Sequence, residues 1–139
     1  SAALGVLLFF QALLGLFLFV KVVGYTPDAI FAYYAKKSMH GLFEAVVPHS
    51  VFITIALAGV VHFLYFLEGV SLGAKRFLTN ALFVLFVLDQ GSVFLILQDF
   101  MFAAYAKLFA VAAFLTLFGV VAWVIFKEAL DESKEAFGE

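Results

Sequence analysis

Cysteine is absent from this chain of 139 residues. Its absence excludes disulfides, thiolate nucleophiles, haem attached covalently to cysteine and iron–sulfur clusters held by cysteine. Charged residues are also scarce, at 13% of the chain, and the net charge is −2. The sequence contains neither a basic stretch nor a glycine-rich phosphate loop, so nucleic acid is not an expected partner.

Apolar side chains make up most of the sequence. Hydrophobic residues account for 66% of the chain and the mean hydropathy is +1.16, whereas a typical soluble domain is about half apolar and about one quarter charged. A chain of this length has too little interior to bury so much apolar surface, so the remainder must face lipid. We expect a multi-pass integral membrane protein surrounded by membrane lipid.

Four apolar runs are long enough to cross a bilayer, which takes about 20 residues. Within a single domain they cover residues 2–23, 40–68, 77–97 and 103–126, and a charged helical tail follows over 127–139. Thr26, Pro27 and Asp28 are typical of a helix start, with an N-cap hydroxyl, a proline and an acid. The fold class predicted is all-α: an integral membrane up-down four-helix bundle with a short interfacial helix between spans one and two.

The orientation in the membrane rests on basic residues. Lys75, Arg76, Lys127 and Lys134 lie on the side of the termini, and the other four basic residues lie on the opposite side. Because the loop with Lys75 and Arg76 is short and the tail is charged, we expect cytoplasmic termini in a bacterial inner membrane.

Two further residues interrupt the spans. Gln11 should face other helices, and Pro48 either begins the membrane helix of span two or kinks a longer one.

All three histidines, His40, His49 and His62, lie in span two, where ionisable groups are costly and indicate function. His49 and His62 are 13 residues apart, or about 20 Å along a helix. This spacing resembles that of the haem-ligand histidines on one helix of di-haem b-type cytochromes. In this respect the chain resembles four-helix b-type cytochromes and quinone-interacting respiratory membrane subunits. The resemblance implies a b-type haem or a quinone bound through His49, His62 and His40.

The chain departs from the cytochrome pattern in two ways. Thirteen steps of about 100° place the His49 and His62 rings about 140° apart around the helix. Spans one, three and four contain no histidine. A second axial ligand would have to come from another subunit or from a different residue type, such as Met101.

A different set of span-two residues falls on one stripe of an unbroken helix: His40, Glu44 and His62. His40 and Glu44 can share a hydrogen bond or a metal near the membrane interface. His62 is about 27 Å from Glu44 along the helix, too far to join the same metal. A purely structural role stays open for each of the three histidines, with His49 exposed to headgroups and His62 bonded to a neighbouring helix.

Asp89 lies about 12 residues into span three. An isolated carboxylate there is costly and should be protonated, paired or hydrated. Lys107 enters span four from the side by which span three leaves, so the two charges can meet. One interpretation is a proton-relay or quinone-headgroup site built from Asp89, Gln90, Tyr105 and Lys107. The other is that span three ends early, at the polar residues 89–92.

The sequence shows no self-contained catalytic site, because nucleophile–base pairs and the H-E-x-x-H motif are missing. At most the chain is an electron-transfer subunit. We therefore expect a small integral membrane subunit of a respiratory or electron-transfer complex, with haem b or quinone as cofactor. Two alternatives remain, a non-catalytic accessory subunit of a larger membrane complex and a small oligomeric transporter or proton pathway. Other membrane subunits or further copies of the chain are the expected partners.

Overall fold

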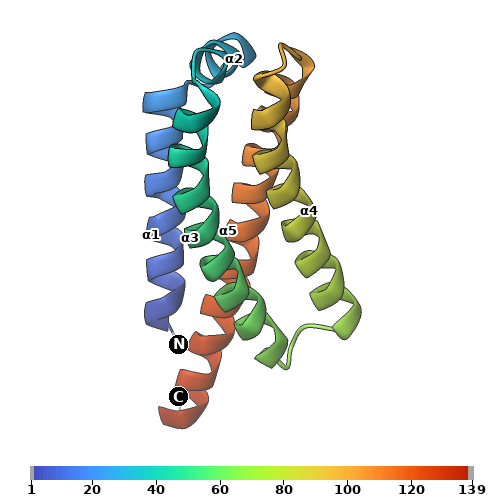
Figure 1. Ribbon diagram of the computed structural model, residues 1–139. Helices are drawn as coiled ribbons and strands as arrows, with labels where there is room; N and C mark the ends of the chain where they lie inside the picture. The colour runs from blue at the N-terminus through green and yellow to red at the C-terminus, as the bar shows by residue number, and fades with distance from the viewer. Residues whose placement is uncertain (1, 138–139) are drawn as a thin grey trace.

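A computed structural model describes residues 2–137, with side chains for residues 6, 7, 9–128 and 130. Within this range the chain is helical and contains no strand. The elements, in order, are α1 (Ala2–Leu18), its π-helical continuation η1 (Phe19–Val23), α2 (Pro27–Ala35), α3 (Met39–Phe66), α4 (Leu72–Ile96) and α5 (Phe102–Phe137). Helices α1, α3, α4 and α5 run lengthwise and α2 lies across one end, while α1 begins and α5 ends at the opposite end (Figure 1).

Three of these helices are long and apolar enough to cross a membrane: α3, α4 and the part of α5 from Phe102 to Glu128. A fourth candidate is a bent pair, because the segments Phe9–Val23 and Pro27–Ala35 pass the same test together but meet at an angle of 75°. The prediction of an all-α, multi-pass integral membrane protein is therefore confirmed.

The turn into α2 follows the predicted start signal. The Thr26 hydroxyl accepts a hydrogen bond from the Ala29 N–H at 3.3 Å, and Pro27 is the first helical residue. Gly24 precedes this start with a φ of 102°, in the left-handed region that glycine adopts without strain. A Cβ at Gly24 would also lie 2.7 Å from the Ala29 Cβ. The chain can therefore turn sharply from η1 into α2 only with glycine at this position.

Helix α3 begins at Met39, where the Ser38 hydroxyl accepts a hydrogen bond from the Gly41 N–H at 3.1 Å. Pro48 lies inside this continuous helix, so the alternative in which Pro48 begins the membrane helix is wrong. Helix α4 begins at Leu72, before the predicted residue 77, because Ser71 caps it by accepting from the Ala74 N–H. Helix α5 includes the charged tail as far as Phe137.

Helix α5 is the element on which the others assemble, since α1, α2, α3 and α4 all pack against it. One buried cluster joins α3, α4 and α5 and consists of Leu57, Val60, Leu64, Leu82, Phe118, Val121 and Ile125. A smaller cluster holds α2 on the turn between α4 and α5 through Ile30, Ile96, Ala103 and Ala104. Over the described residues, α1 packs on α5 and has no comparable packing with α3.

Polar contacts fix the turn between α3 and α4. The Glu128 carboxylate on α5 accepts hydrogen bonds from the backbone N–H groups of Glu68 at 2.6 Å and Gly69 at 3.3 Å. The buried Lys75 ammonium donates to the carbonyl of Tyr65 at 3.1 Å and to that of Leu67. The Lys75 contacts satisfy carbonyl groups at the end of α3 that lack intrahelical partners, and the Glu128 contacts satisfy N–H groups of the turn itself.

Candidate functional site

A buried ion pair connects α4 and α5 inside the membrane-spanning region. The Lys107 ammonium lies 2.6 Å from Asp89 Oδ1, and the two side chains are only 5% and 13% exposed. Seven residues separate Asp89 from the end of α4, which places it about 10 Å inside that end. The prediction that Asp89 and Lys107 meet is confirmed. The alternative early end of span three is wrong, because α4 continues through Asp89 to Ile96.

A hydrogen-bond network extends from this pair to α3. The Gln90 amide donates to Asp89 Oδ2 at 2.5 Å, and its carbonyl oxygen accepts from the Ser50 hydroxyl at 2.7 Å. Ser50 also lies 2.7 Å from the Val46 carbonyl oxygen. Lys107 on α5, Asp89 and Gln90 on α4, and Ser50 on α3 therefore form one connected unit, in which both carboxylate oxygens have partners. Such buried networks are stabilising when their members are satisfied.

A cavity of about 480 Å³ adjoins the network and is bounded by side chains from all five helices. Its volume falls within the range of about 300–1,000 Å³ typical of small-molecule sites. The polar residues that line it are Gln11, Tyr33, Tyr34, His49, Asp89, Gln90 and Lys107. The remaining walls are apolar, with Phe52, Ile53, Ala56, Phe86, Phe114 and Phe118 among them.

Tyr34 of α2 covers the ion pair at one end of the cavity. The Lys107 ammonium lies 5.2 Å from the centroid of the Tyr34 ring, within the range of a cation–π interaction. Burial raises the pKa of Tyr34 above its ordinary value, and the negative charge of Asp89 and the neighbouring Tyr33 raise it further. The hydroxyl of Tyr34 therefore stays protonated at physiological pH and can donate a hydrogen bond into the cavity.

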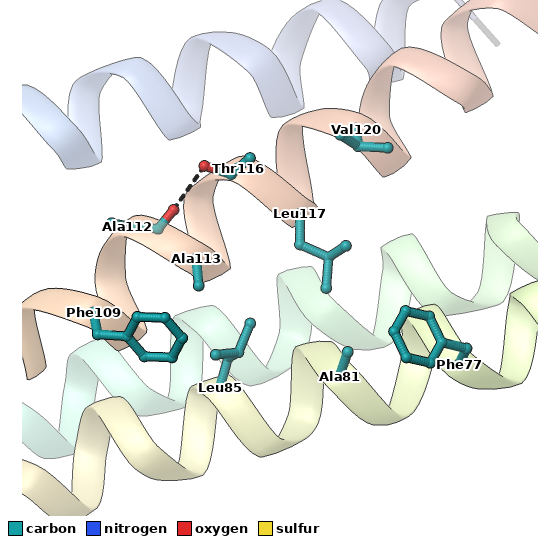
Figure 2. A pocket seen from close by; sticks show the side chains of 9 residues that line it. All are labelled: Phe77, Ala81, Leu85, Phe109, Ala112, Ala113, Thr116, Leu117 and Val120. Carbon is teal, nitrogen blue, oxygen red and sulfur yellow. Dashed lines mark hydrogen bonds between the residues drawn. The ribbon is translucent and has the colours of Figure 1, made fainter. Parts of the chain in front are cut away.

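A second hollow, on the outer face of α4 and α5, has about 460 Å³ and differs in its chemistry (Figure 2). Apolar side chains such as Phe77, Leu85 and Phe109 line this open groove. Its one polar residue, Thr116, donates its hydroxyl hydrogen to the Ala112 carbonyl at 2.8 Å, as the dashed line in Figure 2 shows. The groove has no group suited to hold a polar ligand, so the cavity is the candidate site.

Only one of the three histidines lines the cavity, and it is His49. His40 instead pairs with Glu44, with His40 Nε2 3.1 Å from Glu44 Oε1, and both side chains are largely exposed. His62 is exposed as well and stacks edge-on against Phe66, with the two ring centroids 4.8 Å apart. The stripe predicted to carry His40, Glu44 and His62 is thus a face that α3 presents to its surroundings.

The structure brings His40 and Glu44 together, as predicted, but it does not bring the predicted haem-ligand histidines together. Within the described part of the chain, no group of three or more histidine, aspartate or glutamate side chains is placed to hold a metal ion. The His40–Glu44 metal site stays a prediction with two protein ligands. The bis-histidine haem likewise lacks a second histidine near His49, since all three histidines are on α3 and the other two face outward.

Tyr105, predicted to belong to the Asp89 site, is not among the residues that line the cavity, and its side chain is 56% exposed. It stands two positions before Lys107, so its side chain projects about 200° away around α5. Tyr33, Tyr34 and Ser50 take part in the site instead. The tyrosines lie in the predicted interfacial helix, to which the sequence assigned no role in the site, and Ser50 gave no signal beyond its position after His49.

Comparison with known protein families finds a match that covers most of the chain. A family model named Aq_1264_TM, described as a transmembrane helical domain, matches residues 24–136. The matched region includes α2, α3, α4 and nearly all of α5, and therefore includes the ion pair, the hydrogen-bond network and His49. No curated protein and no solved structure matches the chain.

Proposed function

The chain belongs to the Aq_1264_TM family of transmembrane helical domains. On that premise we propose that it is a membrane subunit of an electron-transfer complex and binds a quinone-type ligand beside Asp89 and Lys107. One observation supports this most strongly: a buried ion pair borders a cavity whose other walls are largely apolar. Ionisable groups inside a membrane are rare and mark ligand or proton pathways.

The chemistry of the cavity suits a flat ring that carries two oxygens. Lys107, the Tyr34 hydroxyl and the second N–H of Gln90 are donors for such oxygens. When a quinone takes up two electrons from a redox partner, it also takes up two protons and becomes a quinol. His49 and Asp89 border the cavity and are the titratable groups suited to pass these protons to the ligand.

The placement of the histidines favours a quinone over a haem within the single chain. His49 lines the cavity, whereas His40 and His62 face outward on the same helix. A b-type haem bound to His49 would need its second axial ligand from another subunit or from a residue other than histidine, and Met101 is not among the residues that line the cavity. A redox difference spectrum of the purified protein checks this alternative, because a sharp alpha band would assign a haem.

For the membrane arrangement, we propose that α1 with η1 forms a fourth crossing and completes an up-down four-helix bundle. The two segments have 17 and 5 residues, or roughly 33 Å of helix, which matches the hydrocarbon core. Helix α2 then lies at the interface as a short connection. The termini, together with Lys75 and Arg76, lie on the cytoplasmic side of a bacterial inner membrane.

The test is direct binding of a short-tailed benzoquinone to the protein in lipid nanodiscs. We expect saturable binding of one quinone per chain, and a loss of at least about 10-fold in affinity for Asp89→Asn. His62→Ala is the matched control, because it removes an intramembrane ionisable group outside the cavity, and it should bind like the wild type. Absence of saturable binding by the wild-type protein would contradict the proposal.

A second function, as an accessory subunit of a larger membrane complex, is favoured by the outward stripe of α3. His62 presents a polar ring from a membrane helix toward its surroundings, and polar groups at such positions commonly bond to neighbouring helices. If this function holds, partner subunits should co-purify with the wild type and with Asp89→Asn, and should be lost with His62→Ala.

A further inference from the structure

The cavity has its charged groups at one end and mainly apolar walls at the other, and it is bounded by α1 and α3, which pack less on each other than each packs on α5. We propose that its ligand carries a long apolar tail and reaches the site from the lipid, through a slot between α1 and α3. The ring occupies the end near α2, and the tail runs along the apolar half and out through the slot. The identity of the ring rests on the proposed function, whereas the slot and the tail rest on the observations below.

The slot follows from how α1 and α3 are held. Helix α1 packs on α5 and α3 packs on α4 and α5, with no comparable packing between α1 and α3. Both nevertheless line the same cavity, α1 through Gly15 and Leu18 and α3 through Phe52. These lining side chains stay accessible, with Leu18 56% and Phe52 72% exposed. A Cβ added at Gly15 would meet no atom within 4 Å, so this side of α1 is open.

The polarity of the walls changes along the cavity. Near α2 the walls carry Tyr34, His49, Asp89 and Lys107, whereas the other half has one uncharged polar residue, Gln11 of α1, among apolar side chains. His49 precedes Ile53 and Ala56 on α3, and Lys107 precedes Phe114 and Phe118 on α5, so both helices turn apolar as they leave the α2 end. Helix α4 runs the other way, and its Phe86 lies three residues before Asp89, again toward the apolar half. Helices α3, α4 and α5 therefore all place polar groups at the α2 end, where the ring of the ligand binds, and apolar side chains at the other end, where its tail lies.

The α2 end of the cavity is closed by packing. Ile30 of α2 is fully buried against Ile96, Ala103 and Ala104 of the turn between α4 and α5. The Tyr34 ring lies over the Lys107 ammonium on the same side. A ligand arriving from water on this side would have to displace α2, whereas one dissolved in the bilayer meets the open slot. The slot therefore selects lipid-soluble ligands.

The first experiment compares two benzoquinones with the same ring, one without a tail and one with a decyl tail, in nanodiscs. Affinities are referred to the free quinone in the aqueous phase, so that each methylene removed from water in the bound state contributes about 0.8 kcal/mol, or roughly a factor of four in affinity. Removal of two or more from water then predicts at least about 10-fold tighter binding of the tailed quinone. Gly15→Trp should fill the slot and remove most of this advantage, while the tail-free quinone binds unchanged. Ala58→Trp on the outward face of α3 is the matched control and should leave both affinities unchanged.

Two results would overturn the proposal. One is equal affinity of the two quinones for the wild type, and the other is an unaltered tail advantage in Gly15→Trp.

If neither quinone binds, the proposed function fails, and the slot is then judged by a second measurement. The chain has no cysteine, so a nitroxide can be placed at Ala56→Cys in the cavity and at Ala58→Cys on the outward face. If the slot is open, the nitroxides at both sites should collide with dissolved oxygen at comparable rates and should collide only rarely with a water-soluble nickel chelate. A nitroxide at Ala56→Cys that reaches neither reagent would refute the slot.

Discussion

Two hollows of nearly equal volume, about 480 Å³ and about 460 Å³, lie on opposite sides of α5. Lys107 faces the first and Phe109 the second, because two steps along a helix turn by about 200°. The first is bounded by five helices and contains a buried ion pair. The second is an open apolar groove between α4 and α5. Volume therefore does not distinguish the candidate site from the surface, whereas the position of charge does.

The comparison also shows where this membrane protein tolerates polarity. The groove satisfies its single hydroxyl within α5 itself and leaves only apolar atoms for lipid chains. The cavity places Asp89, Gln90 and Ser50 on two helices and connects them through hydrogen bonds. Side chains on the lipid side can therefore change with little effect, while changes on the cavity side should be costly.

The largest effect should come from breaking the ion pair on one side only. Lys107→Met leaves the Asp89 carboxylate buried without its partner, which typically costs about 3–5 kcal/mol. We expect a strongly lowered melting temperature in detergent and loss of quinone binding. The double variant Asp89→Leu with Lys107→Met should recover most of the stability without the binding. A double variant as unstable as Lys107→Met would show that the charges themselves are needed for folding.

Removal of the ring over Lys107 should have the next largest effect. Tyr34→Leu loses a cation–π contact that is worth about 1–2 kcal/mol in a desolvated site, and the stability of the purified protein should fall accordingly. Tyr34→Phe retains the ring and should retain the stability, while its quinone affinity falls because the hydroxyl donor is gone. Equal stability of Tyr34→Leu and Tyr34→Phe would contradict the assigned role of the ring.

Ser50→Ala tests the network at its α3 end. The substitution removes the donor to the Gln90 carbonyl oxygen, and we expect a loss of about 1 kcal/mol in unfolding free energy. The quinone affinity should fall by a few-fold, because Gln90 is then free to turn its amide away from Asp89. Thr54→Ala is a suitable control, since Thr54 bonds only to the Ser50 carbonyl within the same helix. A quinone affinity equal to that of the wild type would remove Ser50 from the site.

The smallest effect is expected in the groove. Ala113→Leu adds apolar atoms to an open, lipid-facing hollow (Figure 2), and such changes away from buried features usually stay within about 0.5 kcal/mol. Binding of either benzoquinone should match the wild type. A clear loss of binding in Ala113→Leu would show that the groove contributes to the site and would end the distinction between the two hollows.

The sequence predicts the helices of this fold better than the directions in which their side chains point. Long apolar runs and the Thr26–Pro27 start are local signals, and they located three of the four predicted spans and α2. The meeting of Asp89 with Lys107 was also predictable, because a short turn between antiparallel helices brings their facing ends together. Side-chain direction was harder to predict, because every face of a membrane helix is apolar and periodicity no longer separates inside from outside. Tyr105 was assigned to the site for this reason, although it projects away from it.

The role of Tyr34 depends on tertiary structure that no local pattern contains. It reaches Lys107 only because the chain bends sharply after η1 and α2 packs onto the turn between α4 and α5. The sequence predicted that His40, Glu44 and His62 lie on one face of a helix, since helical geometry alone determines this. Its outward direction depends on which side of α3 meets α4 and α5, and the sequence does not contain that information.

The ion pair has a consequence for the biogenesis of the protein. Helix α4 leaves the ribosome before α5, so Asp89 reaches the membrane before the lysine that neutralises it. An aspartate at the centre of an inserting helix costs about 2.5–3.5 kcal/mol on insertion scales, and this is an upper bound for Asp89, which lies about 10 Å inside the end of α4. The two helices are joined by a turn of only a few residues, from Leu97 to Met101. Partition of α4 into lipid is thus most favourable when α5 inserts with it as a helical hairpin, so that Asp89 and Lys107 enter the membrane as a pair.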